Sequence, residues 1–311
     1  PAPPQGVAGA ALPKDAGIRQ QRAQLIRNID RVATIPKLLA EHGYLSHQSG
    51  KWWEGNFSRG GFTHGMTHGD PDRGGRHGDE GLKIGREGLK PVFDFIDEAG
   101  EQPYFLWYAP FLPHSPHNPP RRLLEKYQTP DRPIPLARYY AMCEWLDETC
   151  GQLLDYVDQK DQRDNTIVIF VVDNGWIQRT PQTPVPEGWR RSFAPRSKQS
   201  PFDGGTRTPI MIRWPQKVVP GLRQHLASSI DIAPTVLRAC GLEPPAQMVG
   251  IDLVDQSSSE VPLRSHLLGE SYAHDIADLA DPEKTLLYRW CIEENWKLLV
   301  TYDGTIGRNK S

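Results

Sequence analysis

The sequence is poor in cysteine, and this limits both disulfide frameworks and zinc sites. Only four of the 311 residues are cysteines, and none forms a CxxC pair of the kind that holds zinc. Cys143 and Cys150 fall on one expected helix, where seven residues of rise, about 10 Å, place them too far apart to bridge. Cys240 and Cys291 are isolated in the sequence. Four free thiols are the simplest expectation, with a Cys240–Cys291 bond left open.

The sequence also lacks a charge excess and long apolar runs. Its 36 basic and 38 acidic residues give a formal net charge of −2, which argues against nucleic acid or a membrane surface as a partner. No apolar stretch approaches the roughly 20 residues that cross a bilayer. Hydrophobic residues still make up 38% of the chain, enough for a sizeable core. A small anionic substrate remains compatible, because a local pocket can be cationic on a nearly neutral protein.

What the sequence does contain is an alternation of helix and strand patterns, which predicts an α/β fold with a mixed, largely parallel sheet flanked by helices. The expected helices cover residues 18–42, 87–100, 134–160 and 229–239. The expected strands cover residues 44–49, 103–109, 166–172 and 209–214. Residues 54–86 and 176–206 are expected to be long polar loops, and residues 242–283 are linker-like.

The end of the chain has a different pattern. Residues 285–302 alternate in polarity around Glu294-Asn295, which predicts an antiparallel hairpin. We therefore expect two domains: an α/β domain over residues 1–255 and a small C-terminal antiparallel subdomain over residues 256–311.

Chemistry-bearing residues follow the expected strands. Asp173-Asn174-Gly175 ends the apolar run 167–172, which predicts a fully buried parallel strand. Open α/β sheets bind ligands at the carboxyl ends of their strands. Asp and Asn offer hard oxygen ligands of the kind that Ca²⁺ or Mg²⁺ takes.

Three other segments carry cations or histidine near strand ends. Lys51 follows the strand 44–49, His114 and His117 follow the strand 103–109, and Lys198 precedes the strand 209–214. If the first three strands are parallel, their ends meet at one edge of the sheet. Lysines suit a tetrahedral oxyanion, a hard metal ion polarises its oxygens, and a histidine can protonate a leaving oxygen near neutral pH.

The motifs around these residues occur in a recognisable order. They are Gly50-Lys51-Trp52, Ala109-Pro110 with Pro113-His114, Val172-Asp173-Asn174-Gly175, Lys198 with Gly204-Gly205-Thr206-Arg207-Thr208-Pro209, and Asp231-Ile232-Ala233-Pro234-Thr235. Each motif alone is modest, but their shared order is specific. Over about residues 34–302 the chain resembles the sulfatase family of the alkaline-phosphatase superfamily.

The resemblance implies a sulfuric-ester hydrolase acting on carbohydrate or aryl sulfates. It implies that Asp173 and Asn174 bind Ca²⁺, or another divalent cation such as Mg²⁺ or Mn²⁺. Lys51 and Lys198 would hold sulfate oxygens, and His114 would lie near the leaving group. A periplasmic or secreted location is suggested by the resemblance alone.

Three further residues are expected to line the substrate site: Trp53, His117 and Arg207, of which Arg207 also braces its loop. The family usually has a histidine where Trp53 stands. Tryptophan cannot transfer a proton, although it can form an apolar or stacking wall.

The nucleophile of the family is missing from this sequence. Sulfatases carry Cys/Ser-x-Pro-x-Arg, whose first residue becomes formylglycine, and neither that motif nor the family's early Asp-Asp pair occurs here. We expect both upstream of Pro1, and we expect the 311 residues alone to be weakly active or inactive, because covalent catalysis has no starting atom. A missing central strand predicts lowered stability, or a homo-oligomer that covers the exposed sheet edge.

Purely structural roles are the alternative for these residues. Without the other motifs, Lys51 would be interpreted as an ordinary surface lysine, and His114 could simply hydrogen-bond its own loop. The run His64, His68, Asp70, Asp72, His77 and Asp79 fits no standard zinc pattern, so substrate recognition is favoured over a second metal. The alternatives in function are a phosphodiester or phosphonate-monoester hydrolase on the same fold, and a non-catalytic domain that binds sulfated glycans.

Overall fold

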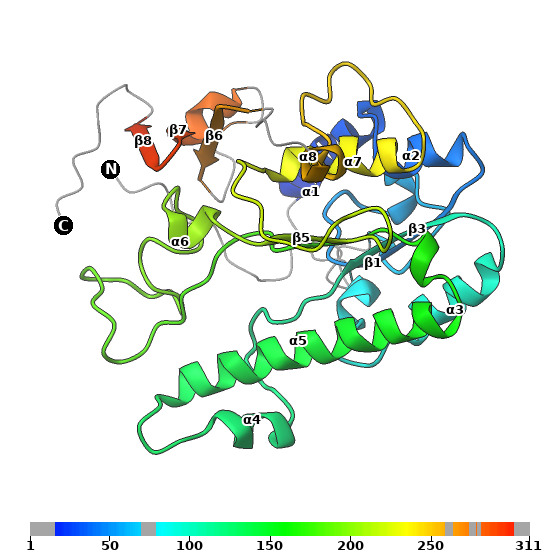
Figure 1. Cartoon of the computed structure of the whole chain (residues 1–311). Coiled ribbons are helices and arrows are strands. Elements are labelled where there is room, and N and C mark those ends of the chain that lie inside the picture. Colours follow the sequence, from blue (N-terminus) through cyan, green and yellow to red (C-terminus); the bar gives the residue numbers. More distant parts are fainter. Residues whose placement is uncertain (1–15, 70–78, 259–263, 274–277, 279–280, 302–311) are drawn as a thin grey trace. The chain divides into compact units, whose positions relative to one another are not determined.

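The computed structural model describes residues 16–69, 79–258, 264–273, 278 and 281–301 (Figure 1). The chain forms two compact units, Val7–Gln162 and Arg163–Ser311 together with Pro1–Gly6. The predicted domain boundary at residues 255 and 256 stays a prediction. Of the predicted histidine and aspartate run, Asp70, Asp72 and His77 lie outside the described residues. No helix in the described residues is both long and apolar enough to span a bilayer.

The unit Val7–Gln162 is built around a parallel sheet. In chain order its elements, with η for 3-10 helices, are α1 (Ala16–Ile26), η1 (Arg27–Arg31), α2 (Ile35–Ala40), β1 (Leu45–Gly50), η2 (Phe57–Gly60), β2 (His64–Gly65), η4 (Asp79–Lys83), α3 (Lys90–Ala99), β3 (Tyr104–Ala109), α4 (Arg121–Tyr127) and α5 (Ile134–Gln159). The strand order is β2-β1-β3, and both pairings are parallel. This confirms the predicted strands at 44–49 and 103–109 and their shared direction.

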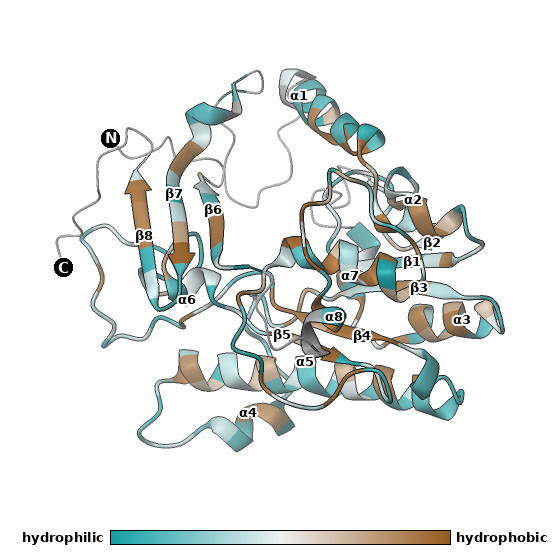
Figure 2. Cartoon of the chain, turned by 45° about the horizontal axis from the view of Figure 1, so that its top comes forward, coloured by the Kyte–Doolittle hydropathy of each residue, from teal (hydrophilic) through white to brown (hydrophobic). Residues whose placement is uncertain are grey.

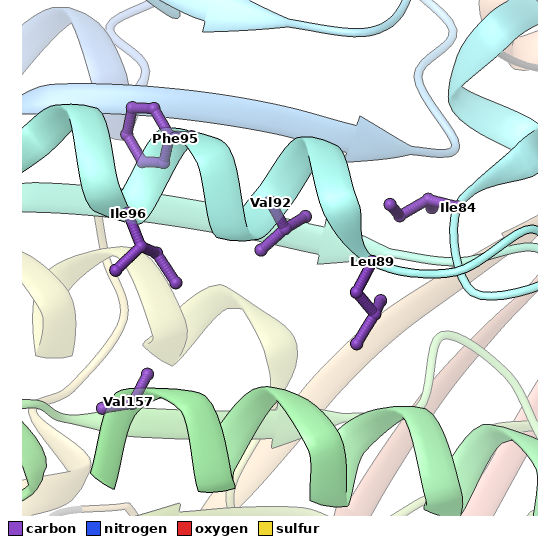
Figure 3. Close-up of a cluster of buried hydrophobic side chains, with 6 residues drawn as sticks. All are labelled: Ile84, Leu89, Val92, Phe95, Ile96 and Val157. Atoms are coloured by element: carbon purple, nitrogen blue, oxygen red, sulfur yellow. The ribbon is translucent and has the colours of Figure 1, made fainter. Parts of the chain in front are cut away.

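The core of this unit lies between the sheet and helices α3 and α5. On α3, Val92, Phe95 and Ile96 recur at helical spacing and are at most 2% exposed. Figure 3 shows Ile96 of α3 and Val157 of α5 pointing toward each other. Leu106 of β3 packs against the same cluster. Burying each such side chain stabilises the fold by about 1.5–3 kcal/mol, so α3 is held firmly against the sheet.

The predicted helix over 18–42 is wrong as a single element. The structure divides it into α1, η1 and α2, with an extended residue at Thr34. Thr34 caps α2 by accepting a hydrogen bond from the Lys37 backbone N–H, and Pro36 occupies the first turn. Capping threonine and first-turn proline are start signals for a new helix, and they outweigh the continuous periodic pattern.

The described residues of the unit that begins at Arg163 form two antiparallel sheets. Its elements are η5 (Arg163–Asn165), β4 (Val168–Val171), α6 (Asp203–Thr206), β5 (Ile210–Arg213), η6 (Ser229–Asp231), α7 (Ile232–Ala239), α8 (Leu253–Ser258), β6 (His266–Tyr272), η7 (Pro282–Thr285), β7 (Leu286–Glu293) and β8 (Trp296–Thr301). Strands β6, β7 and β8 form one sheet, and β4 pairs with β5 in the other. The predicted hairpin is confirmed as β7–β8, and a parallel sheet with a small antiparallel C-terminal sheet confirms the predicted fold class. Strand β6 and helix α8 lie in the stretch predicted to be linker-like.

The prediction of a fully buried parallel strand over 167–172 is wrong. Among the described strands β4 pairs only with β5, antiparallel, and Val171 is 40% exposed. An apolar run alone does not distinguish a central strand from a half-covered one. Met211, in β5, is 55% exposed. A second subunit that covers an exposed sheet edge therefore stays a prediction.

A buried ion pair holds the start of the helix after β5. The Asp231 carboxylate, 0% exposed, accepts two hydrogen bonds from the Arg264 guanidinium at 2.7 and 2.9 Å. It also accepts the backbone N–H groups of Ser228 and Ile251. Four donors satisfy this buried charge, so the segment before β6 is fastened to η6.

Candidate functional site

Strands β1 and β3 end side by side, so the loops that follow them leave the sheet at one edge. Gly50 lies opposite Ala109 in the parallel register, and the Lys51 backbone N–H donates to the Ala109 carbonyl oxygen at 2.7 Å. Gly50 has φ of +83°, and a Cβ there would lie 1.7 Å from that oxygen. Only glycine allows this approach. The motif glycine therefore brings Lys51 next to the segment that carries His114.

Lys51, Phe111 and His114 form one row. The Lys51 ammonium lies 5.4 Å from the Phe111 ring centroid. The Phe111 and His114 rings stack with centroids 4.5 Å apart. The loops after two neighbouring strands thus place a cation and an imidazole against the same aromatic ring.

The surroundings of His114 indicate its tautomer. His114 Nδ1 lies 3.0 Å from the Ser115 carbonyl oxygen. A carbonyl can only accept, so we assign the hydrogen to Nδ1. In the neutral imidazole Nε2 is then the basic nitrogen, able to receive and return a proton.

Arg86, which the sequence analysis did not single out, holds the loop that carries His114. Its guanidinium donates to the His114 carbonyl oxygen at 3.0 Å, to the Asn118 side-chain oxygen at 2.7 Å and to the Pro116 carbonyl oxygen at 3.3 Å. It also lies over the Trp145 ring, 5.5 Å from the centroid. Burial lowers the pKa of Arg86 from its ordinary value. The sequence could not reveal this role, because an arginine in a polar loop belongs to no recognisable motif.

His117 and Trp53 lie in the same unit. Burial, and secondarily the charge of Arg86, lower the pKa of His117, which favours its neutral form, and its ring lies 5.6 Å from that of Tyr139. The Trp53 side chain is 41% exposed, and its backbone N–H donates to the Glu54 carboxylate at 3.1 Å. An exposed indole two residues after Lys51 can serve as a stacking surface.

In the other unit, the turn Asp173-Asn174-Gly175 follows β4 and packs against Gly204-Gly205 of α6. The Gly175 backbone N–H donates to the Gly205 carbonyl oxygen at 2.9 Å. A Cβ at Gly175 would lie 2.1 Å from the Gly204 carbonyl oxygen. The Asn174 amide nitrogen donates to the Gly175 carbonyl oxygen at 2.9 Å, so its amide oxygen is the atom left to act as a ligand. Asp173 is exposed.

Lys198 lies beside the same turn. Its ammonium is 5.7 Å from the ring centroid of Trp176, which follows Gly175 directly. Gly205 makes this winding of the loop possible, because a Cβ there would lie 2.4 Å from the Ser197 carbonyl oxygen. Arg207 is exposed just after α6, and its backbone N–H donates to the Asp203 carbonyl oxygen at 2.9 Å. The long loop before β5 thus gathers predicted residues around the end of β4.

The donor chemistry at this turn suits a hard cation but does not complete a shell. Asp173 and Asn174 supply carboxylate and amide oxygens, which Ca²⁺ and Mg²⁺ prefer. Two residues fall short of the six or more oxygens that Ca²⁺ takes. Within the described ranges, no three His, Cys, Asp or Glu side chains form a group able to hold a metal ion.

The structure therefore assembles the predicted site as two groups. Lys51 and His114 meet in the unit Val7–Gln162, and Lys198 meets the Asp173 turn in the unit that begins at Arg163. The roles of these residues stay predictions.

Two family models match the chain. The sulfatase model matches residues 13–242, and the model of the C-terminal part of N-sulphoglucosamine sulphohydrolase matches residues 196–303. Among curated proteins, N-acetylgalactosamine-6-sulfatase from the dog, Canis lupus familiaris, is 29% identical over 265 residues, which cover 72% of this chain and 48% of the relative. The human enzyme of the same name is 29% identical over 70% of this chain and 46% of its own length. The chain thus spans about half the length of these relatives.

Solved structures share the fold. A Bacteroides thetaiotaomicron protein from work on the metabolism of multiple glycosaminoglycans aligns with a TM-score of 0.65 at 19% identity, covering 88% of this chain and 67% of that one. The phosphonate monoester hydrolase of Silicibacter pomeroyi aligns with a TM-score of 0.56 at 16% identity, covering 92% and 78%. At these identities the likeness shows the fold alone. The sulfatase model covers well over half of the residues, and the chain belongs to the sulfatase family of the alkaline-phosphatase superfamily.

Proposed function

We propose that this chain carries the anion-binding and cation-binding part of a sulfuric-ester hydrolase that acts on small sulfated carbohydrates or aryl sulfates. The observation that carries the proposal is the row of Lys51, Phe111 and His114, which sets a cation and a proton-transfer group together where two parallel strands end. Family membership and relatives named as N-acetylgalactosamine-6-sulfatases support the choice of substrate class.

Each residue has a defined task in this proposal. Lys51 and Lys198 bind sulfate oxygens through their ammonium groups, which stabilise negative charge as the ester bond breaks. His114 Nε2 first takes up a proton and then delivers it to the departing oxygen, while Nδ1–H donates to the Ser115 carbonyl and fixes the ring.

Asp173 and Asn174 would hold a divalent cation such as Ca²⁺, Mg²⁺ or Mn²⁺. When bound, that ion supplies positive charge that polarises a sulfate oxygen. Trp53 and His117 form part of the substrate wall, and Arg207 contacts the substrate or braces its own loop.

The proposal assigns no nucleophile to these 311 residues. They contain no Cys/Ser-x-Pro-x-Arg motif that could yield formylglycine. We therefore expect the chain to bind sulfated ligands with weak or absent turnover. In that state it would behave as a binding module for sulfated glycans.

A phosphodiester or phosphonate-monoester hydrolase is the second candidate. The chain shares its fold with a phosphonate monoester hydrolase, and both ester classes present a tetrahedral, oxygen-rich centre to the enzyme. They differ chiefly in charge, so parallel binding measurements distinguish them.

Isothermal titration calorimetry of the whole chain with N-acetylgalactosamine 6-sulfate and Ca²⁺ tests the proposal. We expect Lys51→Met to weaken binding at least tenfold, because a charge-assisted contact is lost. Lys90→Met is the matched control, since that side chain is 82% exposed and pairs with Asp94. Absence of binding, or equal binding by Lys51→Met, contradicts the proposal. Tighter binding of an aryl phosphodiester favours the second candidate.

A further inference from the structure

The inner face of the C-terminal sheet carries a lysine fixed against a tryptophan. Gly269 of β6 lies opposite Trp290 of β7, and a Cβ at Gly269 would lie 2.0 Å from the Trp290 ring. The indole therefore lies across the glycine. Lys297 of β8 places its ammonium 4.8 Å from the Trp290 ring centroid, an arrangement in which a cation is attracted to the ring face.

The Lys297 ammonium also contacts α6, which lies beside the three-stranded sheet in Figures 1 and 2. Its ammonium donates to the Thr206 hydroxyl at 2.7 Å and lies 3.4 Å from the Asp203 carboxylate. The Lys297 side chain is only 15% exposed. Burial lowers the pKa of Lys297, and Asp203 opposes that shift. A lysine this deep normally needs partners, and here they lie at the two ends of α6.

Helix α6 is in turn the support of the Asp173 turn. Its Gly205 carbonyl oxygen accepts the Gly175 backbone N–H at 2.9 Å, and Gly204 lies too close to Gly175 to admit any side chain there. A displacement of α6 would therefore move Gly175, and with it Asp173 and Asn174 just before it. The path from β8 to the turn consists of direct contacts, all within one unit.

We propose that Lys297 is a positioning residue for the turn Asp173-Asn174-Gly175, through which the C-terminal sheet controls cation binding. The link to cation binding rests on the proposed function, whereas the link to the geometry of the turn does not. Lys297 fixes both ends of α6, and α6 fixes the turn. The C-terminal sheet thereby sets the affinity of the site without contributing a ligand.

Two measurements on the whole chain test this proposal. Backbone hydrogen exchange at Gly175 is measured without metal, and Tb³⁺ binding is followed by luminescence sensitised by the adjacent Trp176. We expect Lys297→Met to speed exchange at Gly175 at least tenfold and to weaken Tb³⁺ binding at least fivefold. Lys297→Arg, which keeps a charged donor, should restore part of both. Lys284→Met is the control, because that lysine is 56% exposed in the same unit and pairs with Asp278.

The outcomes separate this proposal from the proposed function. Unchanged Gly175 exchange in Lys297→Met overturns the positioning role. If wild-type chain does not bind Tb³⁺ but Gly175 exchange still rises in the variant, the positioning role stands and the cation site fails. Should Lys297→Met not fold, Thr206→Val replaces it, since that change removes the hydroxyl that accepts from Lys297 and leaves the Lys297 side chain in place; the same hydroxyl also donates to the Phe202 carbonyl oxygen at 3.2 Å. It should speed Gly175 exchange at least threefold, and no change there also overturns the role.

Discussion

Replacing Arg86 by methionine should release the loop that presents His114. Methionine keeps an unbranched side chain of similar length but removes all five guanidinium donors. The acceptors that lose their donor are the His114 carbonyl, the Pro116 carbonyl and the Asn118 side chain. These span the whole turn after Phe111, so the change acts on the loop rather than on the sheet.

The magnitude follows from the burial of each contact. The hydrogen bond to the His114 carbonyl is partly buried, and a bond from a charged donor in such a place is worth about 1.5–3 kcal/mol. The other two acceptors are exposed and add on the order of 0.5 kcal/mol each. Loss of the stacking on Trp145 adds about 0.5–1 kcal/mol. We expect the free energy of unfolding to fall by about 3–5 kcal/mol.

Urea unfolding of the whole chain measures this change. Arg121→Met is the matched control, because its side chain is 91% exposed and pairs with Glu125 one turn further along its own helix; we expect no measurable change there. A loss below about 1 kcal/mol for Arg86→Met, or a loss equal to the control, would refute the reasoning. A second readout is NMR titration of His117. Removing the Arg86 charge should raise the pKa of His117, because a repulsive neighbour of the protonated ring is gone.

Three further predictions concern stability. Burial lowers the pKa of His47 to about 4, whereas a histidine in the unfolded chain titrates near 6.5. As the pH drops from 6.5 toward 4, the unfolded chain therefore takes up a proton that the folded chain does not, and the free energy of unfolding should fall by up to about 3 kcal/mol. In unfolding curves measured over this pH range, His47→Leu should reduce this fall. Gly50→Ala should cost at least about 2 kcal/mol more than Gly43→Ala in urea unfolding, because both positions have φ near +80° but only Gly50 faces the Ala109 carbonyl at 1.7 Å; equal costs would contradict the close approach. Asp231→Ala should cost about 3–5 kcal/mol in the same assay, since it removes the partner of Arg264, whose side chain is only 12% exposed; a loss under about 1 kcal/mol would contradict that role.

Much of the fold could be predicted from local sequence patterns. Alternating apolar segments with intervening helices gave the parallel pair β1–β3 and the long helix α5, and alternation with a turn at Glu294 gave the β7–β8 hairpin. These elements depend on periodicity and turn residues that lie close together in the chain. Where capping competed with periodicity, as at Thr34, the helix boundary was wrong. Where an apolar run had to be assigned a partner, as for β4, the direction of pairing was wrong, because pairing depends on residues distant in sequence.

The candidate site could likewise be predicted only in part. The order of the motifs was enough to name candidate site residues: Lys51, His114, Lys198 and Asp173. It could not identify the residues that hold their loops in place. Arg86 and Lys297 act through backbone carbonyls, a hydroxyl and aromatic rings far away in the chain. Such contacts leave no recognisable spacing in the sequence.

The central claim is that Lys51, Phe111 and His114 form an anion site where β1 and β3 end. A crystal structure of this chain grown with inorganic sulfate tests it most directly. We expect a sulfate ion in contact with the Lys51 ammonium group and the His114 ring. Sulfate ions bound elsewhere on the chain, with none at Lys51, would contradict the claim.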